Sequence, residues 1–235
     1  MALCASSSTA KDSVRVPEDC KTLQKAVNRV HKNDRLTTIV VGKGEHRIDE
    51  YYLEIPSATN IVGDPGVLKS EIVVVGGIKF KKGIQGNCHL QHLTLRQARQ
   101  CGVEGMSSFT MEDVIVEQCA DVGVYAVGTG VIGRCTNVEV RQCGWSGVFA
   151  ACGASITLIG AKTTVHHNCT HSDDYGLKVY GPSATIQLVS PLTKEHVSID
   201  NGGGGNWGAK NGGANINQIK TIEPADLAGE TKSNR

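Results

Sequence analysis

Apolar residues recur along the middle of the chain at a spacing of about two dozen residues, and within each recurrence they alternate with polar residues. Four segments align on this pattern, the last more loosely than the others: residues 92–103, 113–124, 137–148 and 162–168, with a close at 176–177. Positions two apart on a strand share a face, so the aligned apolar positions are expected to point to one core. They form three columns: Leu95, Val116, Val140 and Val165; Leu93, Val114, Val138 and Thr163; and Leu90, Met111 and Cys135.

This repeat predicts an all-β fold, a single-stranded right-handed parallel β-helix. About six or seven coils form the solenoid, and equivalent positions stack ~4.8 Å apart. Helical repeats would need an apolar period of about 3.6 residues, and leucine-rich repeats would need a Leu/Asn consensus that the chain lacks. A glycine at the same point of each coil indicates a corner with a left-handed or crowded backbone. These glycines are Gly102, Gly123, Gly147 and, after an insertion, Gly176.

The two ends of the chain depart from the repeat. Residues 20–31 carry apolar side chains on one helical face and follow Asp19, a residue type that caps helices. We therefore expect a helix that covers the open N-terminal end of the solenoid. The β-helix domain is expected over residues 15–222, between a disordered N-terminus at 1–14 and a disordered polar tail at 223–235.

Composition indicates the cellular location and the classes of partner to expect more than it indicates the function. The formal net charge of +1 gives no reason to expect nucleic acid or a membrane as a partner, and no apolar stretch approaches the length of a membrane span. The nine cysteines show no zinc-type spacing, and residues 1–8 lack the basic and apolar regions of a signal peptide. We therefore expect reduced cysteines, a cytoplasmic or otherwise intracellular location, and no metal or other cofactor.

An outward column of alternating charge is the first candidate for binding. Its members, one coil apart, are Arg96, Glu117, Arg141 and His166. The column forms either a surface charge ladder that stabilises the register or a groove for a charged polymer or peptide. The next position of each coil is two residues from a core position, which makes it a candidate for an inward polar stack. Its members are Gln97, Gln118, Gln142 and His167.

Aromatic residues form the second candidate for binding. Tyr125 and Phe149 occupy equivalent positions directly after a core residue, so alternation points both outward, and Trp145 is also off the core parity. Exposed stacked aromatic rings hold sugar rings or the apolar side chains of a partner; the alternative is ordinary surface packing. Glu104 and Lys178 extend the column on either side.

The densest polar segment lies in and beside the insertion that precedes Gly176. If the protein is an enzyme, its side chains could move protons, act as acid and base, or hold a cation. These candidate catalytic residues are His166, His167, His171, Asp173, Asp174 and Lys178. Consecutive aspartates converge only if the loop turns, so a solvated loop and a binding or metal role stay open as alternatives.

Two kinds of segment resemble those of a known superfamily. Residues 22–27, 39–44 and 60–63 are similar to the opening coils of the pectin-lyase-like right-handed β-helices. The units Val-x-Val-x-x-Cys/Asn-x-x-x-Gly-Val are similar to their carbohydrate-binding and sugar-hydrolase repeats. The resemblance covers about residues 15–222 and implies the fold. That superfamily includes pectate lyases, polygalacturonases, pectin methylesterases, uronate epimerases, phage tailspikes and interaction modules of F-box and Shc SH2-binding proteins, so the resemblance does not decide the activity.

Three functional hypotheses follow. The hydrolase pattern of spaced aspartates before Gly-His-Gly and the epimerase pattern Asp-Pro-His-Asp are both absent from the sequence. The leading hypothesis is therefore a non-catalytic module whose strand face binds a protein segment or a glycan. The alternative is a polysaccharide-acting lyase, hydrolase or uronate epimerase, with calcium as a cofactor only if it is a lyase. The second alternative is a structural fibre of the tailspike type, and the sequence leaves the oligomeric state open.

Overall fold

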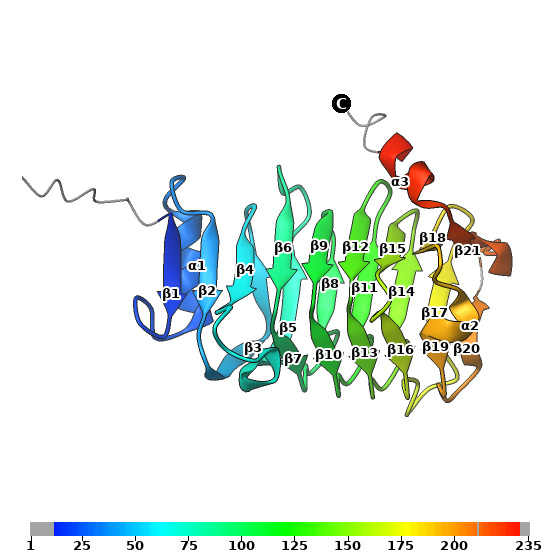
Figure 1. Cartoon of the computed structure of the whole chain (residues 1–235), viewed down its shortest axis with the longest axis horizontal. Helices are drawn as coiled ribbons and strands as arrows, with labels where there is room; N and C mark the ends of the chain where they lie inside the picture. Colours follow the sequence, from blue (N-terminus) through cyan, green and yellow to red (C-terminus); the bar gives the residue numbers. More distant parts are fainter. Residues whose placement is uncertain (1–11, 211, 231–235) are drawn as a thin grey trace, which may run out of the picture.

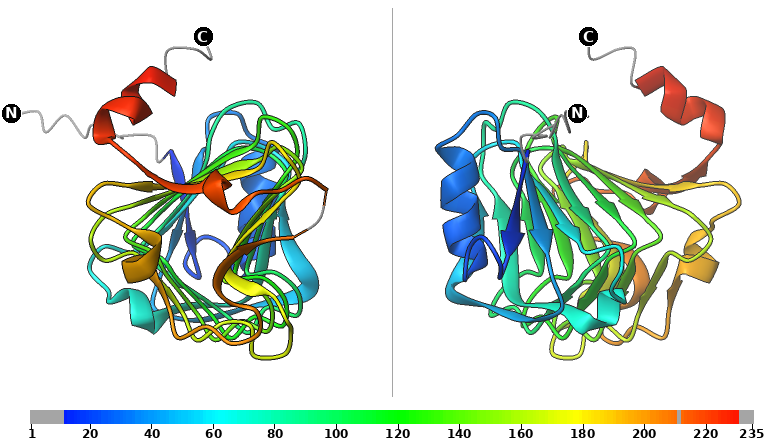
Figure 2. Two further views of the ribbon diagram at one scale, coloured as in Figure 1. Left: turned by 90° about the vertical axis from the view of Figure 1, so that its right-hand side faces the viewer. Right: turned by 60° about the vertical axis from the view of Figure 1, so that its left-hand side comes forward.

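The computed structural model describes residues 12–210 and 212–230 and is a parallel β-solenoid of about seven turns with little helix (Figure 1). The predicted right-handed parallel β-helix is therefore confirmed. Seen along its axis in Figure 2, the solenoid is a roughly three-sided coil around a central core. The strands of successive turns lie in parallel register along each side.

Each side of the coil is a strand face, and face 1 is a sheet of its own. In order along the axis it contains β1 (Ser13–Val16), β2 (Thr38–Val41), β4 (Asn60–Gly63), β6 (Cys88–Gln91), β9 (Phe109–Glu112), β12 (Ile132–Thr136), β15 (Ser155–Ile159), β18 (Thr185–Val189) and β21 (Ile219–Ile222). The parallel order means that each strand is reached only after a full turn of the chain.

The second sheet bends round a corner and supplies the other two faces. This is because β5 (Ile72–Phe80) pairs with β7 (Thr94–Arg96) through its first half and with β8 (Val103–Gly105) through its second half. β3 (Gly44–Ile55) pairs along β5 and spans both faces. Face 2 continues with β7 (Thr94–Arg96), β10 (Ile115–Glu117), β13 (Glu139–Arg141), β16 (Thr164–His166) and β19 (Ser198–Ile199). Face 3 continues with β8 (Val103–Gly105), β11 (Val124–Val127), β14 (Val148–Ala151), β17 (Tyr175–Tyr180) and β20 (Gly205–Ala209).

The predicted apolar columns form the core. Val116 pairs with Leu95 on one side and with Val140 on the other, and Val140 pairs with Val165. All of these side chains are 0% exposed. Because each added turn buries a further set of apolar side chains against the last, the fold is stabilised along its whole length rather than at one centre.

Between faces 2 and 3, at what we call the second corner, the chain turns through a residue with a left-handed backbone. Gln97, Gln118, Gln142 and His167 have φ of 54°, 57°, 57° and 55°. Their side chains are exposed, so the candidate inward polar stack is wrong. The left-handed residue breaks the alternation of the strand, and the inward stack begins one residue later. Its members are Ala98, Cys119, Cys143 and Asn168.

Asn168 satisfies backbone groups that the second corner would otherwise leave buried without partners. Its Oδ1 accepts a hydrogen bond from Cys143 N at 3.1 Å, and its Nδ2 donates to Val140 O at 3.0 Å. The same Nδ2 also donates to Asn201 Oδ1 at 3.0 Å, which extends the polar stack into the next turn. Buried polar groups need such partners, so this amide is structural.

The expected N-terminal helix is present and starts later than predicted. The buried residues of α1 (Leu23–His31), which packs on β1, β2 and β3, are Leu23, Ala26, Val27 and Val30. Thr22, rather than Asp19, is its N-cap, because the Thr22 hydroxyl accepts a hydrogen bond from Lys25 N. β1 begins at Ser13, ahead of the expected domain boundary at residue 15, while residues 1–11 lie outside the described residues.

The C-terminal end holds more regular structure than the sequence predicts. A short helix α2 (Lys194–Val197) precedes β19, and α3 (Pro224–Glu230) is helical where the sequence predicts a disordered tail. Two single-turn 3-10 helices complete the described chain, η1 (Lys69–Glu71) and η2 (Ile216–Gln218). None of the helices in residues 12–210 and 212–230 combines the length and apolarity needed to cross a bilayer. The cysteines of this part of the chain are all free.

Replacing Gly123 with alanine should destabilise the solenoid. A Cβ at this position would lie 2.3 Å from Val140 Cγ1 and 2.7 Å from the Gly147 carbonyl oxygen, so stacked backbone would have to move. We expect a loss of roughly 1–3 kcal/mol in the free energy of unfolding, measured by urea denaturation. Gly66→Ala is the matched control, because its Cβ would meet only Asp64 Oδ1 at 3.4 Å, an ordinary contact. An equal loss in both variants would contradict the crowding argument.

Candidate functional site

The charged column on face 2 is a stack, as predicted, but its charged side chains form ion pairs with one another. Arg96, Glu117 and Arg141 pair in register on β7, β10 and β13. Glu117 Oε1 accepts from Arg96 Nε at 2.5 Å, and Glu117 Oε2 accepts from Arg141 Nη2 at 2.6 Å. Only 5% of the Glu117 side chain is exposed, against about a third of each arginine. The prediction that Glu117 is exposed is therefore wrong, because two guanidinium groups cover it.

The Glu117 carboxylate is held in its charged form. Burial acts to raise the pKa of Glu117, but hydrogen bonds and positive charge from Arg141 and Arg96 outweigh it, and the pKa lies below its ordinary value. Arg141 Nη1 also donates to Glu139 Oε1 at 2.6 Å. The column thus neutralises itself, which favours a register-stabilising ladder over a groove for a charged polymer.

Of the candidate catalytic residues, His166 is the last predicted member of this column on face 2, and His167 follows it at the second corner. His166 Nε2 is 3.3 Å from Glu139 Oε1, and His166 Nδ1 is 2.8 Å from His167 Nδ1. In the contact between the two rings one Nδ1 donates the hydrogen bond and the other accepts it. The pair is therefore a local hydrogen-bonded unit of the second corner.

Asp174 lies across the second corner, directly before β17, and its carboxylate contacts Lys178 of β17 and Lys210, which follows β20. Lys178 Nζ is 2.9 Å from both carboxylate oxygens of Asp174, and Lys210 Nζ is 3.1 Å from one of them. Asp174 is 4% exposed and Lys178 is 7% exposed. Burial acts to raise the pKa of Asp174, but the hydrogen bonds and charges of Lys178 and Lys210 outweigh it and lower that pKa. Two ammonium groups neutralise this carboxylate, so it is not a free acid or base.

The candidate catalytic residues are consequently not brought together. His171 and Asp173 are exposed in the turn that separates the histidine pair from the Asp174–Lys178 pair. His171 Nδ1 is 2.8 Å from Thr170 Oγ1, and the Asp173 carbonyl oxygen accepts from Lys210 Nζ at 3.1 Å. Across the described residues, no three His, Cys, Asp or Glu side chains are grouped in a way that could hold a metal ion.

The predicted aromatic pair is present on face 3. The rings of Tyr125 and Phe149 stack with centroids 4.8 Å apart and planes inclined by 20°. Lys178 pairs with Phe149 from the next turn, and its Nζ lies 4.3 Å from the centre of the Phe149 ring. Tyr125 therefore covers one face of the Phe149 ring and the Lys178 ammonium covers the other. Burial raises the pKa of Tyr125 to about 12, so its phenol stays protonated at neutral pH.

A second outward column beside this pair was missed by the sequence reasoning. Val127 pairs with Ala151, and Ala151 pairs with Tyr180, which is 39% exposed. The signal was available, because Val127, Ala151 and Tyr180 each follow a member of the first column by two residues. The members of the two columns that reach the surface form what we call the aromatic patch: Tyr125, Val127 and Phe149, which are half-buried, and Tyr180, which is exposed. Ala151 itself is buried. Trp145, 48% exposed, lies at the second corner just before the strand that carries Phe149.

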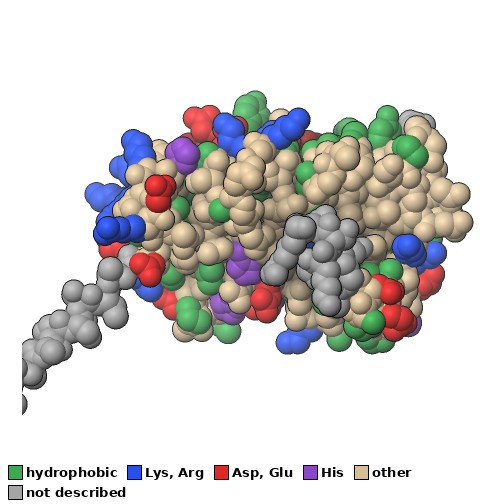
Figure 3. All heavy atoms as spheres, turned by 90° about the horizontal axis from the view of Figure 1, so that it is seen from above, with side chains coloured by type: hydrophobic (Ala, Val, Ile, Leu, Met, Phe, Trp, Pro, Cys, Tyr) green, Lys and Arg blue, Asp and Glu red, His purple; other side chains and the backbone are tan. Residues whose placement is uncertain are grey.

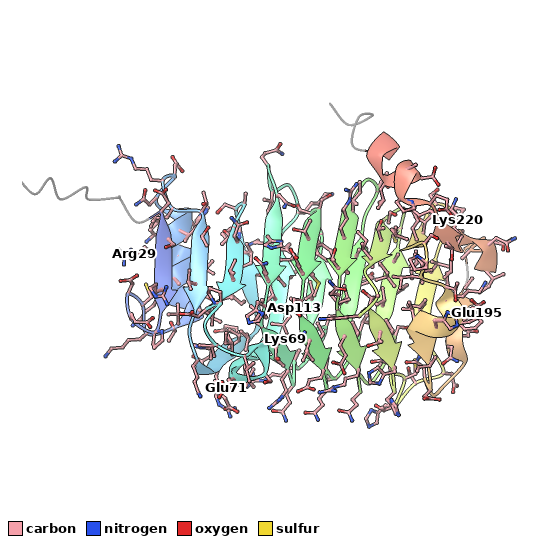
Figure 4. All side chains as sticks on the ribbon, in the orientation of Figure 1. Arg29, Lys69, Glu71, Asp113, Glu195 and Lys220 are labelled. Atoms are coloured by element: carbon pink, nitrogen blue, oxygen red, sulfur yellow. The ribbon has the colours of Figure 1, made fainter. Side chains whose placement is uncertain are left out.

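A polar cluster that the sequence did not predict lies between faces 1 and 2. Lys69 and Asp113 point toward one another in Figure 4, and Lys69 Nζ lies 2.6 Å from Asp113 Oδ1. Asp113 Oδ2 is 2.7 Å from His92 Nδ1, and His92 Nε2 is 2.8 Å from the Val67 carbonyl oxygen. Each polar atom of the cluster therefore has a partner, and the cluster fastens the loop containing η1 to the solenoid.

Acidic and basic side chains are intermixed on the face of the molecule that Figure 3 shows, around a middle of backbone and uncharged polar side chains. No protein-family model and no curated protein sequence matches the chain. Among solved structures, the A-module of the mannuronan C-5 epimerase AlgE4 of Azotobacter vinelandii is similar at 11% identity, over 85% of this chain and 94% of that one, with a TM-score of 0.27. A likeness at this level carries no conclusion about activity.

The Glu117→Gln variant should lose stability at neutral pH and less in acid. Because the pKa of Glu117 is lower in the folded state, its ionised carboxylate stabilises the fold fully above the unfolded pKa of about 4.3. That stabilisation is lost as the pH falls from there through the folded-state pKa. We expect unfolding free energies about 1–3 kcal/mol below those of the unmodified protein near pH 7. Urea denaturation over a series of falling pH should show that gap narrowing below about pH 4. Glu112→Gln, at an exposed position on face 1, is the control; a Glu117→Gln gap that stays constant with pH would show that the ladder does not titrate as argued.

Proposed function

We propose that the protein is a non-catalytic β-helix module that binds a segment of a partner protein on face 3 through the aromatic patch. The observation that carries this proposal is the 39% exposure of Tyr180 on a face whose two preceding turns contribute the half-buried side chains of Phe149, Tyr125 and Val127. Exposed apolar side chains that adjoin one another mark interaction sites more often than isolated ones do. Trp145 adds a second exposed aromatic side chain nearby.

The covered rings favour a protein segment over a glycan. Aromatic side chains bind sugars through a free ring face, and both faces of the Phe149 ring are occupied, one by Tyr125 and one by Lys178. What Phe149 and Tyr125 still offer is ring edges beside the half-buried side chain of Val127. Such a surface suits the aliphatic or aromatic side chains of a protein.

The arrangement of charged residues supports a binding role rather than catalysis. The histidine pair and the Asp174–Lys178 pair lie on opposite sides of the second corner, and both members of the latter pair are buried and bonded to one another. A general acid and a general base must reach the same substrate atom or neighbouring atoms.

The fibre alternative requires a three-fold interface, and sedimentation velocity measures that association directly; we expect a species lighter than a trimer.

Peptides selected from a random phage-display library against the purified protein should bind at the aromatic patch and contain apolar residues. We expect the Tyr180→Ser variant to bind them on the order of tenfold more weakly by isothermal titration calorimetry, because exposed aromatic side chains dominate such contacts. Leu68→Ser is the control, since Leu68 is 69% exposed at a site outside the patch and its loss should leave binding unchanged.

A glycan array tests the other kind of partner with the same two variants. Retention of a glycan that Tyr180→Ser abolishes and Leu68→Ser does not would contradict the proposal of a protein partner. Selected peptides that bind Tyr180→Ser as well as the unmodified protein would remove the aromatic patch as the site.

A further inference from the structure

A bulge in β3 interrupts the regular pairing of strands on faces 2 and 3. β3 and β5 pair in register up to Arg47 and again from Tyr52, whereas β5 has only Gly76 between the partners of these two residues. Residues 48–51 therefore stand out from the wall of the solenoid. β5 passes close beneath them, since a Cβ on Gly76 would lie 2.7 Å from Ile48 Cβ.

A cavity of about 400 Å³ opens beside the bulge, within the usual size range of small-molecule sites. Its lining comes from α1, from the bulge and from the strand that follows the bulge. The lining residues are Gln24, Glu50, Tyr51, Tyr52 and Glu54. Tyr52 and Glu54 point to the same side of β3, because they are two residues apart and the intervening Leu53 is buried.

The lining combines two phenol rings with two carboxylates, which is the chemistry that holds organic cations. A ring face attracts a cation through its quadrupole, and carboxylates add charge. One ring already shows this behaviour, since Lys79 Nζ lies 5.4 Å from the centre of the Tyr52 ring. Tyr51 is 61% exposed, so its ring is open to a further ligand.

The walls of the cavity differ in how firmly they are held. The Tyr52 hydroxyl accepts a hydrogen bond from Cys101 N at 3.1 Å, which fixes the ring in place. Glu54 contacts Lys81 at 3.1 Å, but both side chains are about half exposed, and a surface pair of this kind contributes little and exchanges readily. Glu54 can therefore turn to an incoming cation without a large loss.

We propose that this cavity, the bulge cavity, binds an alkylammonium or guanidinium group, either on a basic side chain of a peptide or as a free quaternary ammonium ion. The proposal is independent of the function proposed above, because no member of the aromatic patch lines the cavity. A metal ion fits less well, since hard cations need six or more oxygen ligands in a shell rather than two carboxylates beside rings. The cavity on the other side of the bulge is lined by Arg47 and Arg99 as well as by Asp49 and Glu50, so its charges balance and it favours a cation less than the bulge cavity does.

Nuclear magnetic resonance titration of the full chain tests the proposal with four cations and one neutral compound. The cations are choline, capped lysine, capped arginine and capped trimethyllysine. The neutral compound is the carbon isostere of capped trimethyllysine, with a tert-butyl group in place of trimethylammonium. We expect at least one cation to bind in the millimolar range and the neutral isostere to bind on the order of tenfold more weakly. Preference for choline or for the capped residues shows whether the source is a free ion or a side chain.

Variants locate the binding. The double variant Glu50→Gln, Glu54→Gln removes charge from the cavity, and the separate variant Tyr51→Ala removes a ring face. Each should weaken binding of the cation on the order of tenfold. These exposed positions tolerate substitution, which thermal unfolding will verify. Glu112→Gln and Tyr180→Ser are controls that should leave cation binding unchanged, and the second of these keeps the test separate from that of the aromatic patch.

Three results would overturn the proposal. The first is equal binding of the neutral isostere, which would show apolar rather than charge recognition. The second is cation binding that survives both cavity variants. The third is no binding of any of the four cations at millimolar concentration.

Discussion

The pairing of each strand with the equivalent strand one turn away is the constraint on which the rest of this structure depends. It holds Val116 between Leu95 and Val140 in the core, and it treats the outward residues of the same strands in the same way. A side chain on the regular surface therefore has two compulsory neighbours, one from each adjoining turn. Those neighbours set its charge state and its exposure before any partner arrives.

This constraint explains why the charges and ring faces of the regular columns are paired with neighbours in the same column. Like charges stacked ~4.8 Å apart would repel, so a stable column alternates in sign or places a cation on a ring. Glu117 lies between two arginines, and Phe149 lies between a phenol ring and an ammonium group. Groups that are free to meet a ligand are consequently found where the stacking is interrupted or where a column ends.

The predictability of each feature follows from the same constraint. The coils carrying Leu95 and Val116 could be read from sequence because alternation and repeat coincide there. The exposure of Gln97 could not, since a left-handed residue breaks the alternation on which strand parity relies. Tyr180 could be found only through its column with Val127, and the burial of Glu117 depends on how two arginine side chains fold over it. The bulge in β3 has no copy in the later turns of the described chain, so alignment of the repeats cannot reveal it.

Register also relates the two proposed sites to one another. Glu54, which lines the bulge cavity, pairs with Lys79, Lys79 pairs with Glu104, and Glu104 pairs with Tyr125 of the aromatic patch. Both sites therefore lie on face 3, three turns apart at ~4.8 Å per turn. An extended peptide rises ~3.3 Å per residue, so a segment running along the axis would span that distance with about four or five residues. A basic side chain at one end and an apolar one at the other are thus sterically compatible with a single ligand, although each site rests on its own contacts.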